Sequence, residues 1–352
     1  MTEESDEVLT RVEGSVGLVT LNRPKAINSL NQQMVDVLSA VLTRWEGDDA
    51  VRAVVLSGAG ERGLCAGGDV VAVYHSARKD GIEARRFWRH EYLLNGQIGR
   101  FGKPYVALMD GIVMGGGVGV SAHANTRVVT DTSKIAMPEV GIGFIPDVGG
   151  AFLLSRAPGA LGLYSALTGA TFSGADAITM GFADHYVPHS ELDAFTAAIV
   201  ADGVESALGG HAIEPPPSTL AAQRDWIDEC FAGDTVEDIV AALRGHRGPE
   251  AGPGAGPAQD AANLIATRSP IAVSVAMEAV RRAAKLETLQ DVLTQDYRVS
   301  SASLRSHDLV EGIRAQIIDK DRNPKWSPGT LAAITAADIE AYFAPVDDDL
   351  SF

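Results

Sequence analysis

Two glycine-rich turns carry the clearest potential for chemistry. They are Cys65-Ala-Gly-Gly68-Asp69 and Met114-Gly-Gly116-Gly-Val-Gly119, and each follows an expected strand and precedes an expected helix. At such positions backbone N–H groups have no partner within the helix, and the missing side chain lets a ligand oxygen approach. For either turn alone, tight turning and close helix packing explain the glycines better. The two turns together could form an oxyanion hole.

Three other patterns fit known chemistry less well. Gly58-Ala-Gly-Glu-Arg-Gly63 matches the dinucleotide pattern G-x-G-x-x-G, but it runs into a second turn and not into a helix that could hold a pyrophosphate. Ser121 lacks the second glycine of a nucleophile elbow, so we expect a buried serine. His185 and His189 are separated by Pro188, which breaks the helix that would align them as metal ligands. We predict no metal site.

The elements that must position the glycine turns repeat in the order strand, turn, helix. Residues 8–21 contain two β-branched runs around Glu13-Gly14-Ser15, which predict a hairpin. Helical spacing from Asn31 to Trp45 predicts a helix with Asn31 as its N-cap. Three further strands are expected, at residues 53–56, 105–109 and 126–130. The last of them leads into the loop 136–150.

The composition changes near Gly203. Glycine and proline become frequent there, and residues 247–257 form a low-complexity stretch typical of a linker. From Gln259 onward the apolar spacing is helical. We therefore predict three parts: a mixed α/β core at residues 1–202, an insertion or linker rich in Pro and Gly at 203–258, and a C-terminal helical region at 259–352.

Composition and charge exclude several classes of protein. The chain has 352 residues, of which 46% are hydrophobic, and a formal net charge of −17, the wrong sign for broad nucleic-acid binding. The two cysteines are too few for a metal cluster or a disulfide scaffold. The acidic N-terminus resembles neither a secretory signal nor a transit peptide, and no apolar run reaches the ~18 residues of a membrane span. We expect a cytoplasmic protein without nucleic-acid or membrane partners.

Four segments of the chain are Asn22-Arg-Pro-Lys-Ala-Ile-Asn28, Leu64 to Asp69, Asp110 to Gly119 and Ala136 to Gly150. In this order and spacing they resemble the crotonase, or enoyl-CoA hydratase/isomerase, superfamily. The resemblance covers about residues 8 to 200. The resemblance implies a spiral of repeated ββα units. It also implies that the two glycine turns hold the thioester carbonyl of an acyl-CoA, with the N–H groups of Gly68 and Gly116 as donors. It calls for no metal or redox cofactor, since CoA is part of the substrate.

The acidic residues separate the subgroups of this superfamily. Hydratases carry one glutamate three residues past the central glycine and another twenty residues later; here Gly119 and Glu139 stand at those positions. The missing first carboxylate disfavours a hydratase or a dienoyl-CoA isomerase. A second carboxylate appears instead at Asp147, a pattern similar to that of 3-hydroxyisobutyryl-CoA hydrolases. Three further segments, apart from the four named above, also resemble this subgroup: residues 89–95, 290–297 and 307–326.

The chemistry of the residues agrees with that resemblance. Hydrolysis of a thioester needs an acceptor for the charge on the carbonyl oxygen, and a carboxylate that acts on water as a base or on carbon as a nucleophile. We assign the first role to the glycine turns and the second to Glu139, and leave the choice between base and nucleophile open. Asp147 could orient Glu139, hold a substrate hydroxyl or share a proton. Without the glycine turns, we would interpret Glu139 as a helix-start acid and Asp147 as a turn residue.

Two further residues are candidates for substrate binding. Glu91 could contact the hydroxyacyl end of the substrate, as the subgroup implies, or lie on an exposed helix face. Lys25 could meet a CoA phosphate, as in relatives, or be a solvated loop lysine.

We therefore predict a crotonase fold with a C-terminal helical region that packs beside or over the site. The expected function is hydrolysis of a short 3-hydroxyacyl-CoA, in particular 3-hydroxyisobutyryl-CoA from valine breakdown, by a protein that could be a homo-oligomer. The alternatives are an enoyl-CoA hydratase/isomerase and a non-catalytic acyl-CoA binding protein on the same fold.

Overall fold

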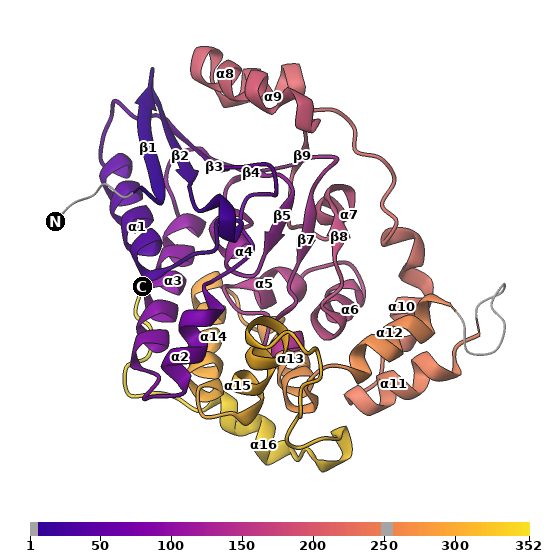
Figure 1. Ribbon diagram of the computed structural model, residues 1–352. Helices are drawn as coiled ribbons and strands as arrows, with labels where there is room; N and C mark the ends of the chain where they lie inside the picture. Colours follow the sequence, from indigo (N-terminus) through magenta and orange to yellow (C-terminus); the bar gives the residue numbers. More distant parts are fainter. Residues whose placement is uncertain (1–5, 248–255) are drawn as a thin grey trace.

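The computed structural model describes residues 6–247 and 256–352, and its strands form two sheets (Figure 1). The six-stranded sheet has the order β1-β2-β3-β4-β6-β9 and is parallel except for the β1–β2 pair. The second sheet has the order β5-β7-β8. The strands are β1 (Val8–Glu13), β2 (Val16–Leu21), β3 (Ala53–Gly58), β4 (Tyr105–Met109), β5 (Ile112–Met114), β6 (Thr126–Val129), β7 (Lys134–Ala136), β8 (Phe172–Ser173) and β9 (His185–Tyr186).

Helices follow most of the strands and make up the later part of the chain. The α-helices of the described residues are α1 (Gln32–Glu46), α2 (Val70–Ala77), α3 (Ile82–Gly99), α4 (Gly116–Ser121), α5 (Gly150–Leu154), α6 (Leu161–Thr168), α7 (Gly174–Thr179), α8 (Leu192–Asp202), α9 (Val204–His211), α10 (Arg224–Cys230), α11 (Val236–Gly245), α12 (Pro257–Ala266), α13 (Pro270–Ala283), α14 (Leu289–Ser303), α15 (His307–Ile313) and α16 (Ala336–Glu340). A short 3-10 helix, η2 (Glu139–Ile142), follows β7, and a π-helical turn (Arg314–Ile318) continues α15.

The opening hairpin and the first helix confirm the sequence prediction. β1 and β2 pair in antiparallel register from Val8 opposite Leu21 to Glu13 opposite Val16. The side chain of Asn31 caps α1 by accepting a hydrogen bond from the Met34 N–H at 2.9 Å. Such a cap satisfies one of the N–H groups that a helix leaves unpaired at its start.

The spiral of strand–turn–helix units brings the two glycine turns side by side. The Met114 N–H donates to the Cys65 carbonyl at 2.9 Å, and the Cys65 N–H donates to the Ile112 carbonyl at 3.1 Å. These bonds join the turn after β3 to the strand that leads into α4. Because they fix backbone to backbone, the relative position of the turns does not depend on side-chain rotamers.

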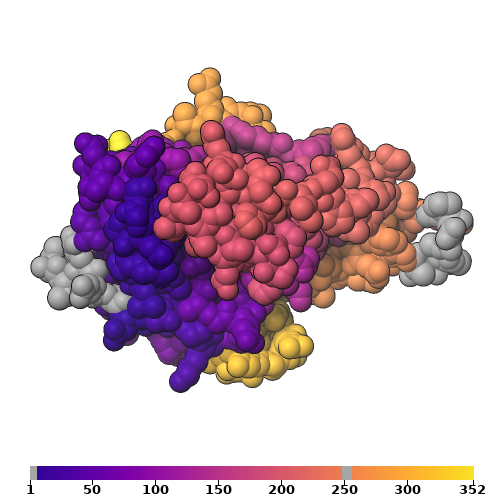
Figure 2. Space-filling view, turned by 90° about the horizontal axis from the view of Figure 1, so that it is seen from above, coloured from indigo at the N-terminus to yellow at the C-terminus, as the bar shows by residue number. Residues whose placement is uncertain are grey.

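The six-stranded sheet is covered on both faces. Its outer face packs Val55, Val106 and Val128 against Phe195 and Ile199 of α8. Figure 2 shows α8 and α9 lying across this face, seen from above. The other face belongs to the main core, shared with α1, α3 and the C-terminal helices. The α13–α16 region lies against the lower part of the molecule in Figure 1, and α14 runs along α3.

The segment predicted as an insertion or linker contains helices α9, α10 and α11. Most of the low-complexity stretch falls at residues 248–255, which lie outside the described residues. The boundaries at 202 and 258 stay predictions.

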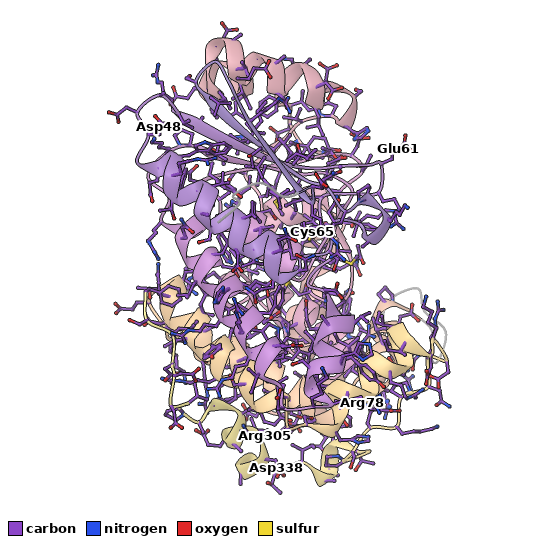
Figure 3. The ribbon with its side chains drawn as sticks, turned by 60° about the vertical axis from the view of Figure 1, so that its left-hand side comes forward. Asp48, Glu61, Cys65, Arg78, Arg305 and Asp338 are labelled. Atoms are coloured by element: carbon purple, nitrogen blue, oxygen red, sulfur yellow. The ribbon has the colours of Figure 1, made fainter. Side chains whose placement is uncertain are left out.

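Both cysteines are free and buried. Figure 3 places Cys65 in the middle of the molecule, far from the exposed ends marked by Asp48 and Asp338. Among residues 6–247 and 256–352, no helix combines the length and apolar content needed to cross a membrane.

Candidate active site

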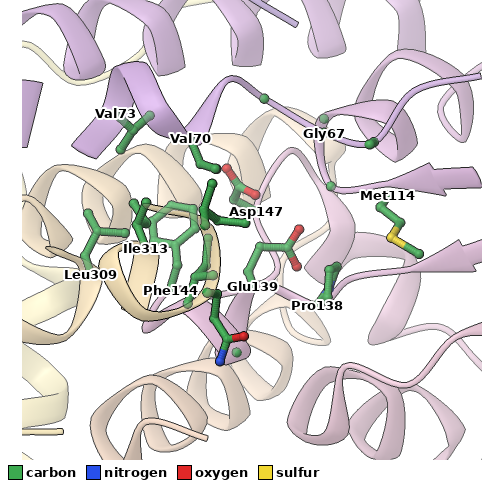
Figure 4. Close-up of a pocket in the computed structure, with 18 of the residues that line it drawn as sticks. Gly67, Val70, Val73, Met114, Pro138, Glu139, Phe144, Asp147, Leu309 and Ile313 are labelled. Atoms are coloured by element: carbon green, nitrogen blue, oxygen red, sulfur yellow. The ribbon is translucent and has the colours of Figure 1, made fainter. Parts of the chain in front are cut away.

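A cavity of about 340 Å³ lies between the two glycine turns, the loop after β7 and the C-terminal helices (Figure 4). Gly68 and Gly116 line one side of it. Glu91, Glu139 and Asp147 also line it, so five of the six residues predicted for the site meet in one place. Figure 4 shows the carboxyl groups of Glu139 and Asp147 directed into the same space.

The backbone of the glycine turns requires glycine at the positions that bend most. Gly67 has φ +112° and Gly115 has φ +49°, values that side chains rarely tolerate. Gly116 begins α4, so its N–H has no partner within the helix. A Cβ built on Gly116 would lie 3.2 Å from the Gly68 nitrogen, so the backbones of the two turns lie close together here. This geometry suits two donors to one oxygen.

The three carboxyl groups come from three elements and are all buried. Glu91 lies on α3 with 2% of its surface exposed, Glu139 begins η2 with 7% exposed, and Asp147 lies on the loop before α5 with 5% exposed. Glu139 is therefore both a helix-start acid and a cavity residue. For Glu91, the alternative of an exposed helix position is wrong.

Burial and mutual repulsion control the ionisation of these groups. Burial raises the pKa of Asp147 to about 7. It also raises the pKa of Glu139 and of Glu91 well above their ordinary values, and the nearby Asp147 raises both further. The three groups cannot all be ionised near neutral pH, so at least one keeps a proton. Such a set can supply an acid and a base or nucleophile together.

Three buried carboxyl oxygens in the described part of the protein have no hydrogen-bond partner, Glu91 Oε1, Glu139 Oε2 and Asp296 Oδ1, and the first two belong to residues that line the cavity. A buried acceptor without a partner is costly, and its persistence at a cavity wall indicates that a ligand or water supplies the donor. The carboxyl groups of Glu91 and Glu139 lie next to the glycine turns. A Cβ on Gly116 would lie 2.5 Å from Glu91 Oε1, and a Cβ on Gly115 would lie 2.8 Å from Glu139 Oε1.

Sequence reasoning missed the residues that hold Asp147. The Tyr92 hydroxyl donates to Asp147 Oδ2 at 2.6 Å and lies 2.6 Å from Ser300 Oγ. Asp296 accepts a hydrogen bond from the Gly149 N–H at 2.8 Å. One sequence signal could have indicated them: Tyr92 on α3, and Asp296 and Ser300 on α14, are polar residues within the apolar stripes of their helices.

The apolar wall of the cavity was also missed in detail. Trp88 stacks on Phe144 with ring centroids 5.2 Å apart and planes 10° apart. Leu309 and Ile313 of α15 complete the wall, as Figure 4 shows. The C-terminal region thus forms part of the site, in agreement with its predicted position beside or over it.

The remaining candidates lie elsewhere. Lys25 is exposed in a short 3-10 helix (Pro24–Ala26) after β2 and does not line the cavity, so its contact with a CoA phosphate stays a prediction. Ser121 is buried and donates to the Gly117 carbonyl at 2.6 Å. His189 lies 2.9 Å from Asp110 at the surface. Within residues 6–247 and 256–352, no group of three His, Cys, Asp or Glu side chains is arranged to hold a metal ion.

The spiral of strand–turn–helix units and the facing glycine turns define a crotonase-fold protein. Residues 16–343 match the family described as enoyl-CoA hydratase/isomerase. The chain belongs to this family.

Particular relatives are similar over the full length. The proteins named 3-hydroxyisobutyryl-CoA hydrolase, mitochondrial, from Danio rerio and Homo sapiens are 37% and 36% identical, covering 99% and 100% of this chain and 92% of each relative. A crystal structure titled carnitinyl-CoA dehydratase from Mycobacterium thermoresistibile is 69% identical, with a TM-score of 0.94 and 99% of both chains covered. One titled enoyl-CoA hydratase from Rhodobacter sphaeroides is 38% identical, with a TM-score of 0.90, covering 97% of this chain and 98% of that one.

Proposed function

We propose that this protein hydrolyses the thioester of a short 3-hydroxyacyl-CoA, with 3-hydroxyisobutyryl-CoA as the substrate, to free CoA and 3-hydroxyisobutyrate. The observation that carries the proposal is the meeting of Glu139, Asp147 and Glu91 with the N–H groups of Gly68 and Gly116 in one buried cavity. The names of the full-length curated relatives support the same substrate, and its place in valine breakdown stays a prediction.

In this proposal the two glycine N–H groups bind the thioester carbonyl oxygen. They stabilise the negative charge that this oxygen acquires when the carbonyl carbon is attacked, which is where preorganised donors contribute most. The apolar wall around Trp88 and Phe144 excludes bulk water and so strengthens these interactions.

Glu139 supplies the attack by one of two routes. As a base, its carboxylate takes a proton from water, the water oxygen bonds to the carbonyl carbon, and the C–S bond breaks with CoA leaving as a thiolate that takes up a proton. As a nucleophile, a Glu139 oxygen bonds to the carbonyl carbon and displaces CoA, and water then hydrolyses the resulting anhydride. A carboxyl that keeps its proton in the cavity can protonate the leaving sulfur in either route.

The substrate hydroxyl has acceptors within the same cavity. Glu91 Oε1 is a buried oxygen without a partner, and Asp147 lines the cavity from the opposite loop. A 3-hydroxyl donates one hydrogen bond, which would satisfy one of these acceptors. A site with such acceptors disfavours an analogue that lacks the hydroxyl, because its own buried groups then stay unpaired.

Addition or removal of water across a C2–C3 bond is the second candidate, favoured by the titles of the two similar crystal structures. Such chemistry in the superfamily uses a glutamate where this chain has Gly119. A Cβ there would lie 2.8 Å from both Asn95 Nδ2 and Val148 Cβ, so position 119 has no room for that side chain. This packing supports hydrolysis over hydration.

The decisive test uses the purified protein with a panel of acyl-CoA thioesters. The panel contains 3-hydroxyisobutyryl-CoA, isobutyryl-CoA and a short 2-enoyl-CoA, and free thiol and the enoyl absorbance are followed in parallel. We expect rapid thiol release from the hydroxyacyl thioester. Loss of enoyl absorbance without thiol release would establish the second candidate, and binding without either reaction would indicate a non-catalytic acyl-CoA protein.

The predicted cytoplasmic location and homo-oligomeric state stay predictions. The curated relatives carry the word mitochondrial in their names, which describes those proteins.

A further inference from the structure

Asp147 is held from behind by a chain of two buried hydroxyls. Tyr92 of α3 donates to Asp147 Oδ2 at 2.6 Å, and its oxygen lies 2.6 Å from Ser300 Oγ of α14. Tyr92 and Ser300 are fully buried. A hydroxyl-to-carboxylate distance of 2.6 Å is typical of a strong, charge-assisted hydrogen bond.

The chemistry of the groups fixes the direction of this chain. An ionised carboxylate only accepts, so the single hydrogen of Tyr92 goes to Asp147. The Tyr92 oxygen then accepts, and Ser300 is the donor. Burial and the neighbouring Asp147 raise the pKa of Tyr92 well above its ordinary value, which keeps the hydroxyl protonated and able to donate.

A second anchor holds the backbone of the same loop. Asp296 accepts from the Gly149 N–H at 2.8 Å, two residues beyond Asp147. Asp296 and Ser300 are four residues apart on α14 and therefore lie on one face of that helix. One face of a C-terminal helix thus fixes the loop twice, once through its backbone and once, by way of Tyr92, through the Asp147 side chain.

We propose that Tyr92 is a positioning residue for the hydrolysis: by donating to Asp147 Oδ2, with Ser300 holding Tyr92 in turn, it fixes the carboxyl group in the cavity and stabilises its charge. The inference rests on the proposed function. In this inference, Tyr92 of α3 and Ser300 of α14 affect catalysis through Asp147 and do not contact the substrate carbonyl.

The charges around Asp147 show why such a donor matters. The titratable groups that interact with Asp147 are Glu91 and Tyr92 from α3, Glu139 from η2 and Asp296 from α14. Three of these four are acids and oppose a charge on Asp147. Against the effect of burial, the Tyr92 hydroxyl gives the larger lowering of the Asp147 pKa, and a hydrogen bond to the Asp147 backbone lowers it further.

The test compares pH profiles of kcat and of kcat/KM for the parent protein, Tyr92→Phe and Ser300→Ala. The control is Tyr105→Phe, because Tyr105 is equally buried and its hydroxyl donates to the Val120 carbonyl at 3.2 Å, away from the cavity. Without the Tyr92 hydrogen bond the Asp147 pKa rises. We therefore expect the acid limb of the profile to move to higher pH by about one unit, and kcat near pH 6 to fall about 10-fold with little change in KM.

The other variants separate positioning from folding. Ser300→Ala should move the acid limb in the same direction by less, and it decides the matter alone if Tyr92→Phe does not fold. Tyr105→Phe should lose thermal stability without moving the limb. The inference would be overturned if folded Tyr92→Phe and Ser300→Ala proteins had the same acid limb in their pH profiles as the parent protein. A parent protein that releases no thiol would instead contradict the proposed function.

Discussion

Glu91 lies directly against the glycine turn at Gly116: a Cβ on Gly116 would come within 2.5 Å of Glu91 Oε1. The same Cβ would lie 3.2 Å from the Gly68 nitrogen. The proposed carbonyl site and the candidate hydroxyl acceptor therefore share one wall of the cavity. Any side chain at position 116 disturbs both.

The first prediction follows from this contact. Gly116→Val should lower turnover of 3-hydroxyisobutyryl-CoA roughly 100- to 1,000-fold, the effect of losing one oxyanion donor, while the far-ultraviolet circular dichroism stays that of a folded protein. The control is Gly210→Val on α9, where a Cβ would meet nothing within 4 Å. A folded Gly116→Val protein with parental turnover would show that the carbonyl does not bind at this turn.

The second prediction concerns the substrate hydroxyl. Isobutyryl-CoA should be cleaved at least about 100-fold more slowly than 3-hydroxyisobutyryl-CoA, because a buried acceptor left unpaired penalises the analogue. Glu91→Gln should narrow this ratio of kcat/KM values, since Glu91 Oε1 is one of the unpaired oxygens. Equal rates for the two thioesters with the parent protein would point to a thioesterase indifferent to the hydroxyl.

The third prediction uses the room at position 119. Gly119→Glu should not create hydratase activity. It should lower the melting temperature, because its Cβ would overlap Asn95 and Val148, and overpacking costs about 1–3 kcal/mol. Adding Asn95→Ala should recover part of the lost stability. Efficient hydration of an enoyl-CoA by the single variant, with an unchanged melting temperature, would show that the cavity tolerates the hydratase arrangement.

The fourth prediction concerns stability and pH. Because burial raises the Asp147 pKa to about 7, the folded state keeps a proton there that the unfolded chain has lost, and this contribution to stability disappears as pH rises from about 4 through 7. Asp147→Asn removes that dependence. The melting temperature of Asp147→Asn minus that of the parent should therefore increase as pH rises. At pH 8 this difference should be about 2 °C or more above its value at pH 4. Asp202→Asn, at an exposed position, is the control; a difference that does not vary with pH would contradict the assignment.

Four of the residues that meet in the cavity were predictable because each lies within a short, contiguous motif. Gly68 and Gly116 stand in glycine turns between a strand and a helix, and Glu139 and Asp147 share one loop. Backbone hydrogen bonds between the turns then place these motifs together. Glu91 was predicted only through the resemblance, since an acid on a helix is more often exposed.

The supporting residues were not predictable from local pattern. Tyr92 and Ser300 are 208 positions apart and meet only because α3 and α14 pack along each other. Asp296 reaches Gly149 across a similar separation. A single sequence shows that these helices contain polar residues within apolar stripes, but not which helix each stripe faces.

The most direct measurement is thiol release from 3-hydroxyisobutyryl-CoA by the parent protein and by Glu139→Gln, with melting curves and substrate affinity recorded for both. Glu139→Gln keeps the shape of the side chain but removes the base or nucleophile. Turnover should therefore fall by at least ~100-fold, while folding and substrate binding persist. A Glu139→Gln protein that melts like the parent and releases thiol at the parental rate would contradict the account.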